Sequence, residues 1–447
     1  MGRARQIASA ENMDRILLDA SAASTDEGEF LLLDASASGT DVGFFINTEI
    51  GTTEVPPEGF VGRSSIAADA IDNTKIADNA IKRENIDDIT DISANRNVII
   101  NGEMKVAQRS ISETALGADT DTYRTVDRFK ITTENTAGRF TMTQTAVTDL
   151  PGFANCTKFD CTTADTSIAA GEDFIFSTAL EGQDLQHFRK GTPEARGWAV
   201  SFYVKGDTNS TYACELLDGD NNRHVCSLFN VTNNWTRVKI NFPADTTGTL
   251  DDDTAASITL NIWLHAGSTY NGGTLQTTWA SKSNANRAVG ADSFFASTDR
   301  EFFITGVQME AGDSCTEFQY ESYERTLAKC QRYFYAVHQD YGPSSSNYSF
   351  MGSGIYYSST NINAAVTFPV PMRAIPTATV NFGSSGNQGF ISYTNGSLDY
   401  IGSSASINMP SIYGTFIQFG DGTGTGGHSG MVATQYDDQF FSFSAEI

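Results

Sequence analysis

Positive charge is scarce in this 447-residue chain, which carries 29 Lys and Arg against 54 Asp and Glu and a formal net charge of -25 at pH 7. Nucleic-acid binding needs many cations to neutralise phosphates, so this composition excludes a general nucleic-acid-binding protein. The chain also lacks an apolar run of eighteen residues, and we expect no membrane insertion. Its polar start at Met1 has no signal-peptide core, which predicts a protein that is not exported by the usual route.

Cysteine pairs and catalytic motifs are also missing. The six cysteines include no C-x-x-C pair, which predicts buried free thiols in a protein folded in a reducing cytoplasm, with a Cys156–Cys161 bridge as the alternative. The five histidines lie in no known motif, and the chain has neither a G-x-S-x-G elbow nor a phosphate-binding loop. Asp218 with Asp220 could be proposed as a glycosidase pair, but abundant carboxylates make that signal weak. We therefore expect no enzyme and no cofactor.

A regular spacing of isoleucine organises the N-terminal part of the chain. Isoleucine returns there every five residues, at Ile66, Ile71, Ile76, Ile81 and Ile86. A period of five fits neither a helix nor a strand, so no single element can gather these side chains on one face. Copies of the segment packed around a common axis would bury them, and we predict a homotrimeric stalk over residues 61–97. A disordered acidic linker is the alternative.

A second repeat precedes the stalk. Residues 16–30 recur as residues 31–45, with ten of the fifteen positions identical. Their Leu-Leu-Asp and Thr-Asp-x-Gly phrases predict short strands joined by turns. A segment this short buries too little surface to be stable alone, so we expect it to order against an oligomer or a docking partner.

Residues 98–322 show short β-branched and aromatic runs broken by Gly, Asn, Asp and Thr. This pattern predicts an all-β fold with a jelly-roll-like antiparallel sandwich. Alternation places Trp198 and Phe202 on one strand face, and we expect the tryptophans to lie in the core rather than to stack on sugars. The clearest strand candidates are residues 139–144, 198–205, 236–242, 257–265 and 301–308.

The last part of the chain is predicted to contain one short helix, Ser322–Tyr335, followed by a charge-poor β knob. The helix either forms a trimer collar or covers a sheet. Surface aromatics beside short polar side chains suit saccharide binding, because sugars offer C–H faces and hydroxyl groups. The candidate receptor-binding residues are Tyr393, Tyr400, Tyr413, Asp421 and His428. Strands are predicted at residues 354–357, 364–368, 378–381, 415–419 and 439–447.

Five phrases, in this order and spacing, resemble the tail fibre proteins of bacteriophages. They are residues 101–109 (NGEMKVAQR), 127–129 (DRF), 201–205 (SFYVK), 306–310 (GVQME) and 330–333 (CQRY). The resemblance covers residues 60–335, although the family often has Trp where this chain has Ala107 and Phe129. It implies a virion-attachment region at residues 1–60, the stalk at 61–97, a carbohydrate-binding-like sandwich at 98–322, and a collar and receptor-binding knob at 323–447.

The resemblance also implies a function. Such a homotrimeric, elongated fibre folds in the host cytoplasm, belongs to the virion as a tail appendage, and docks on a tail or adaptor protein through residues 1–60. It then binds a glycan at the outer surface of the host cell during adsorption. The alternatives are a purely structural virion fibre or decoration protein, and a polysaccharide depolymerase. A depolymerase usually needs a long parallel β-helix or a large catalytic domain, and the sequence shows neither.

Overall fold

The computed structural model describes residues 96–338, 349–382, 390–394, 397–401, 404–420, 422–434 and 440–447. These residues belong to one compact unit, Thr90–Ile447. The pentad isoleucines, the tandem repeat and Asp421 lie outside the described residues, so the predictions made for them stay predictions. Within the described ranges, no helix is long and apolar enough to cross a bilayer.

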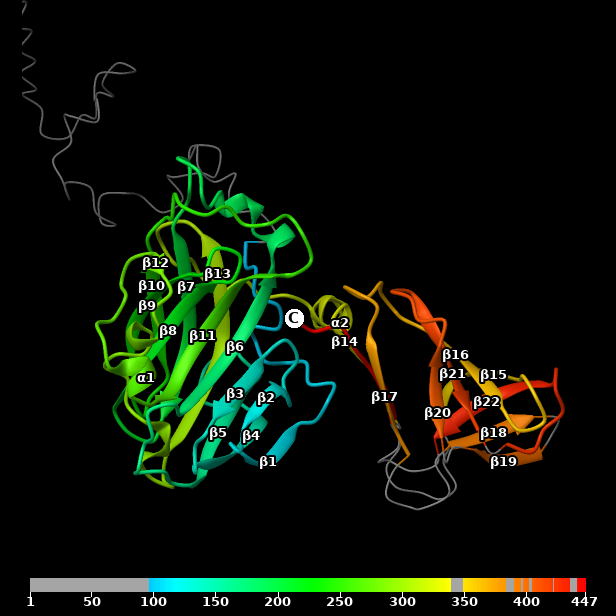
Figure 1. Cartoon of the computed structure of the whole chain (residues 1–447). Helices are drawn as coiled ribbons and strands as arrows, with labels where there is room; N and C mark the ends of the chain where they lie inside the picture. Colours follow the sequence, from blue (N-terminus) through cyan, green and yellow to red (C-terminus); the bar gives the residue numbers. More distant parts are fainter. Residues whose placement is uncertain are drawn as a thin grey trace, which may run out of the picture. The chain divides into compact units, whose positions relative to one another are not determined.

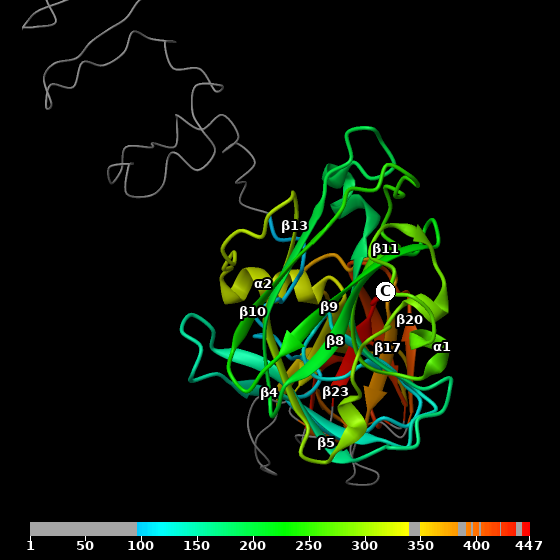
Figure 2. The same cartoon turned by 90° about the vertical axis from the view of Figure 1, so that its left-hand side faces the viewer.

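Two antiparallel sheets form a sandwich (Figures 1 and 2). The six-stranded sheet has the order β1 (Ser112–Leu116), β4 (Arg139–Ala146), β5 (Asn155–Thr163), β13 (Glu301–Ala311), β7 (Trp198–Gly206), β10 (Thr236–Phe242). The seven-stranded sheet has the order β12 (Ala280–Ser281), β9 (Arg223–Val231), β8 (Ser210–Asp218), β11 (Ala256–Ala266), β6 (Asp173–Glu181), β3 (Lys130–Glu134), β2 (Thr120–Tyr123). The chain crosses between the sheets from β5 to β6, from β6 to β7 and from β7 to β8, as in a jelly roll. The predicted all-β sandwich is confirmed.

Alternating side chains build the core between the two sheets. Trp198, Val200, Phe202 and Val204 of β7 are all fully buried there, as predicted. Each such large apolar side chain contributes about 1.5–3 kcal/mol when it leaves water. The prediction that the tryptophans lie in the core is wrong for Trp235, which is only partly buried and donates its indole N–H to Asp149 at 2.8 Å. Trp279 is also only partly buried, and it packs against the edge of the core.

A second layer covers part of the outer face of the seven-stranded sheet. Trp263 of β11 is fully buried beneath this layer, and its ring lies 5.2 Å from the ring of Tyr270. The covering segment, between β11 and β13, includes α1, which lies beside this sheet in Figure 1. The short helices of the sandwich are α1 (Ser268–Asn271), η5 (Gly182–Asp184), η6 (Gln186–Phe188), η7 (Asn284–Asn286) and η8 (Phe294–Ala296).

The remaining strands form two further sheets that share one hydrophobic core. The three-stranded sheet has the order β14 (Phe334–His338), β23 (Phe440–Ser444), β17 (Thr377–Asn381). The other sheet has seven strands in the order β19 (Ser397–Ile401), β18 (Phe390–Thr394), β22 (Ser429–Thr434), β15 (Ser349–Tyr356), β16 (Ile362–Thr367), β21 (Gly414–Phe419), β20 (Ala405–Asn408). We call these the C-terminal sheets.

The predicted helix before the C-terminal sheets is present but shorter than expected. Helix α2 spans Tyr323–Gln331, and the Ser322 side chain caps it by accepting the backbone N–H of Arg325. Its predicted end at Tyr335 is wrong, because Phe334 already begins β14 and pairs with Ser444 of β23. Tertiary strand pairing therefore overrides the helical spacing in this segment.

The cysteines confirm one prediction and correct another. All six are free thiols in the structure, and all are buried except Cys315, which is partly exposed. The alternative Cys156–Cys161 bridge is wrong. Both residues lie in β5, five positions apart, so their side chains point to opposite faces of the strand.

Candidate functional site

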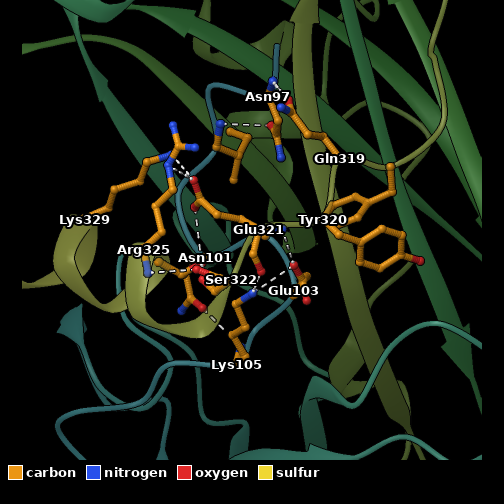
Figure 3. Close-up of a pocket in the computed structure, with 14 residues that line it drawn as sticks. Asn97, Asn101, Glu103, Lys105, Gln319, Tyr320, Glu321, Ser322, Arg325 and Lys329 are labelled. Carbon is orange, nitrogen blue, oxygen red and sulfur yellow. Dashed lines mark hydrogen bonds and ion pairs between the residues drawn. The ribbon is translucent and has the colours of Figure 1, made fainter. Parts of the chain in front are cut away.

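The candidate site is a polar pocket of about 250 Å³, formed by residues 97–105, residues 318–322 and helix α2. We call it the polar pocket. Residues 97–105 are more than two hundred positions from the other two segments in sequence, and they are joined to them directly: the backbone N–H of Asn97 donates to the Gln319 side chain at 2.9 Å. Figure 3 shows charged side chains from all three segments pointing toward one another.

The first wall of the pocket is held by Asn101 and Gly102. Asn101 has a left-handed backbone (φ 62°), and its side-chain amide donates to the carbonyls of Val106 and Asp127 at 2.9 Å each. Its side-chain oxygen accepts the backbone N–H of Lys105 at 3.1 Å. Gly102 packs so closely on β13 that a Cβ would lie 2.0 Å from the carbonyl oxygen of Val307. This loop is therefore fixed before any ligand arrives.

Ion pairs arrange the charges inside the pocket. The Glu321 carboxylate accepts from Arg325 at 2.9 Å and from Lys329 at 2.6 Å, one and two turns further along the chain (Figure 3). On the opposite wall, Lys105 donates to Glu103 at 3.0 Å and also to the Glu321 carbonyl. Two carboxylates and three cations thus meet around one small volume, and they offer both donors and acceptors to a polar ligand.

An aromatic rim borders the pocket. Tyr320 lines it with 55% of its surface exposed, and its ring packs on Phe318 at 5.1 Å and on Phe153 at 5.5 Å. Its hydroxyl lies against Gly152, where a Cβ would be 2.5 Å away. Desolvation raises the pKa of the Tyr320 phenol, which is therefore a neutral donor at pH 7. Tyr320 thus offers a supported ring beside a polar cavity.

A buried cluster in the sandwich has the residue types of a metal site. Ligand atoms of Glu215, His224 and Cys226 lie within 4.8 Å of one another. The Glu215 carboxylate already accepts from His224 Nδ1 at 3.0 Å, from Trp263 Nε1 at 2.9 Å and from Arg287 at 2.9 Å. Its burial would raise its pKa, but these donors lower it to about 2. Arg287 supplies the compensating positive charge, and the donors of other side chains already occupy the Glu215 oxygens. We therefore infer that this cluster stabilises the sandwich rather than binding a metal.

Of the residues predicted from the sequence as receptor contacts, Asp421 lies outside the described residues, and the other four lie in or next to strands of the C-terminal sheets. Tyr413 is exposed in the turn before β21, and His428 is exposed just before β22. These strands are not neighbours, because β15 and β16 lie between them in the sheet. Tyr393 of β18 and Tyr400 of β19 belong to paired strands, so the structure brings their backbones close together.

Asp218 and Asp220, considered as a glycosidase pair, have different roles in the structure. Asp218 is fully buried and binds the Lys190 ammonium at 2.6 Å. Asp220 accepts the backbone N–H of Asp251 at 3.0 Å. Sequence reasoning missed the polar pocket entirely, although Asn101, Gly102, Glu103 and Lys105 of the NGEMK phrase line it. The signal that could have found it was the Asn-Gly pair followed by two opposite charges.

Three of the five phrases that carry the family resemblance, those with Arg109, Arg128 and Tyr333, meet at one buried junction. Arg128 is buried, pairs with Glu446, and donates to the carbonyl of Ala179 at 2.7 Å. Its guanidinium lies 3.5 Å from the centre of the Tyr333 ring. Arg109 reaches the same Glu446 carboxylate at 3.1 Å. These residues thus tie the sandwich to the end of the chain, which is a structural role.

Comparisons with known proteins complete the description of the site. No family model and no curated protein matches the chain. Among solved structures, a CBM4 module matches 47% of this chain and 97% of its own at 9% identity, with a TM-score of 0.24. TmCBM61, solved in complex with β-1,4-galactotriose, matches 48% of this chain and 99% of its own at 10% identity and a TM-score of 0.25. At such low scores these likenesses carry no argument about function.

A bacteriophage structure is also among the matches. The tailspike protein 4 domain of bacteriophage CBA120 matches 49% of this chain and 22% of its own, at 14% identity and a TM-score of 0.24. The same limit applies to this likeness.

Proposed function

We propose that this chain is the subunit of a homotrimeric bacteriophage tail fibre that binds a glycan of the bacterial surface. The fibre part of the proposal is supported by the isoleucine pentads and by the five phrases that resemble tail fibre proteins. Residues 1–60 would dock on the virion, which is where the protein would be located. The binding part is carried by one observation, the polar pocket bordered by Tyr320.

The chemistry of the polar pocket suits a saccharide. Sugar hydroxyls pair with carboxylates, ammonium groups and amides, and the C–H face of a sugar ring stacks on an exposed aromatic ring. The pocket offers all of these: Glu103, Glu321, Lys105 and Asn97 line it, and the Tyr320 ring is exposed beside it. Three copies in one fibre would raise a weak single-site affinity through avidity.

We propose a binding protein rather than an enzyme. The Glu103 and Glu321 carboxylates in the pocket are each held in ion pairs with lysine or arginine, an arrangement that suits the binding of a polar ligand. Incubation with bacterial surface polysaccharide should therefore release no reducing ends and should not lower the viscosity. A rise in reducing ends with time would favour the depolymerase alternative.

The proposal is tested by the binding of the full-length chain to an array of bacterial surface polysaccharides. Replacing Tyr320 by alanine should weaken the binding about tenfold per site, since loss of an aromatic contact costs on the order of 1 kcal/mol or more. Tyr413→Ala is the matched control, because Tyr413 is also exposed but lies in the turn before β21, outside the polar pocket. Loss of binding in Tyr413→Ala alone would move the site to the predicted knob residues.

The structural alternative has its own test. The full-length chain at saturating concentration should compete with the virus for adsorption to its host. A folded chain that binds no polysaccharide and leaves adsorption unchanged would support a virion fibre without a receptor role.

A further inference from the structure

The seven-stranded C-terminal sheet has an inner and an outer face. On β16, Ile362, Ala364 and Val366 are buried in the core, so Asn363, Ala365 and Thr367 point outward. The strand register extends this outer face in rows across the sheet. One row comprises Met431, Ser353, Ala365, Phe416 and Asn408, and the next comprises Ser429, Ile355, Asn363, Gln418 and Ser406. We call these two rows the neutral face.

The neutral face contains no charged side chain. Asp399 is the one charged residue in the seven strands, and it accepts the hydroxyl of Tyr356, a core residue, at 2.8 Å. Elsewhere the chain is strongly charged, with a net charge of -25. Polar contacts on the face are internal: Gln418 donates to Asn363 on the neighbouring strand at 2.9 Å.

Large apolar side chains are exposed on this face. Ile355 is 46% exposed and Met431 is 40% exposed. Exposed apolar side chains that gather on one uncharged face mark an interaction site. A single exposed isoleucine would need no explanation, but here two neighbouring strands present such residues together.

We infer that the neutral face of each chain packs against the other copies of the same chain around the fibre axis. The charge of the chain indicates which partner covers the neutral face. Copies that each carry 54 acidic and 29 basic residues repel one another, so they can approach closely only where a surface carries no charge. Four residues of the face are apolar, namely Met431, Ile355, Phe416 and Ala365, and such groups pack well against their own kind; the other six are uncharged Ser, Asn and Gln. The inference rests on the proposed trimer, in which the stalk would hold the copies at high effective concentration.

Methionine oxidation in the full-length chain provides the test. Peroxide converts exposed Met to the sulfoxide, and Met409, which is 78% exposed, provides an internal reference. Exposure in the single chain predicts that Met431 oxidises at about half the rate of Met409. In the assembled fibre, we expect Met431 to react far more slowly than this ratio. The Ile355→Lys variant should restore the ratio, whereas Ile375→Lys, an exposed isoleucine outside the strands, should leave Met431 protected.

The outcomes separate this inference from the proposed function. A native mass of three chains with Met431 reacting at about half the Met409 rate would overturn the neutral-face contact and leave the trimer intact. Slow oxidation of Met431 in both the wild type and Ile355→Lys would also overturn it. Protection that arises only when bacterial polysaccharide is added would assign the face to a glycan and overturn the inference. A monomeric native mass would instead overturn the proposed trimer.

Discussion

Replacing Lys190 by methionine should destabilise the sandwich strongly. The Lys190 side chain is only 1% exposed, and its ammonium bonds to Asp218 at 2.6 Å and to Asp245 at 3.1 Å. It also donates to the backbone carbonyls of Thr247 at 3.0 Å and Gly248 at 2.9 Å. An internal cation thus sits in a cage of four oxygens, and methionine removes its charge while keeping most of its volume.

The expected cost follows from the groups left behind. Removing one partner of a buried ion pair typically costs 3–5 kcal/mol, because the remaining charge stays buried. Here Asp245 keeps its pair with Arg223 at 2.8 Å, and Asp218 keeps the amide of Asn221 at 3.0 Å. These contacts place the expected loss near the lower end, at about 3 kcal/mol. That is a large share of the roughly 5–15 kcal/mol that stabilises a typical domain.

Tryptophan fluorescence during denaturant unfolding measures this loss. All tryptophans of the chain lie in the sandwich, so the signal reports the sandwich rather than the C-terminal sheets; they are Trp198, Trp235, Trp263 and Trp279. The control is Lys205→Met, which breaks an ion pair with Asp149, a residue that is largely exposed. This control should lose less than about 1 kcal/mol.

The result for Lys190→Met that would refute the reasoning is a loss no larger than that of the Lys205→Met control. A second variant tests the cause of the loss. Adding Asp218→Asn to Lys190→Met removes the uncompensated charge, so the double variant should be more stable than Lys190→Met alone. If the double variant is less stable, the buried charge is not the source of the cost.

Two further predictions concern titration and the end of the chain. Burial and the nearby Glu134 raise the pKa of Asp173 from 3.8 to about 7, so the folded chain binds a proton that the unfolded chain releases, and stability should fall as pH rises from about 4 to about 7. Asp173→Asn should therefore stabilise the sandwich by about 1 kcal/mol or more at pH 8 but not at pH 4, and equal effects at both pH values would contradict this origin. Glu446→Gln should destabilise the fold by roughly 3 kcal/mol by leaving Arg128 buried without its ion pair, as measured by thermal unfolding. Arg325→Gln is its control, because half of that side chain is exposed and its loss should cost under about 1 kcal/mol.

The strands that sequence predicted best have one buried and one exposed face. Residues 236–242 were predicted as a strand with the bounds that β10 has, because polar and apolar side chains alternate along it. Strand β6 was missed, since all nine of its residues are buried and its pattern shows no period of two. Two distant parts of the chain cover its outer face: the segment that contains Tyr270 packs with Ile175, and Arg332 and Tyr333 bond to Glu181.

The candidate site was hidden from sequence for a different reason. Asn97 and Gln319 meet in the polar pocket although they are 222 positions apart, and no local pattern encodes that contact. The knob tyrosines were chosen because exposed aromatics suit sugars, and Tyr413 is indeed exposed. The same reasoning could not identify Tyr320, because its suitability for sugar binding depends on the polar pocket beside it.

The native mass of the purified full-length chain, measured by light scattering, tests the central claim most directly. The fibre proposal predicts three times the 48.3 kDa chain mass, independent of protein concentration in the micromolar range. Such a mass would support the stalk and avidity at the polar pocket together. A stable monomer would contradict the fibre, because the pentad isoleucines would then have no partner to pack against.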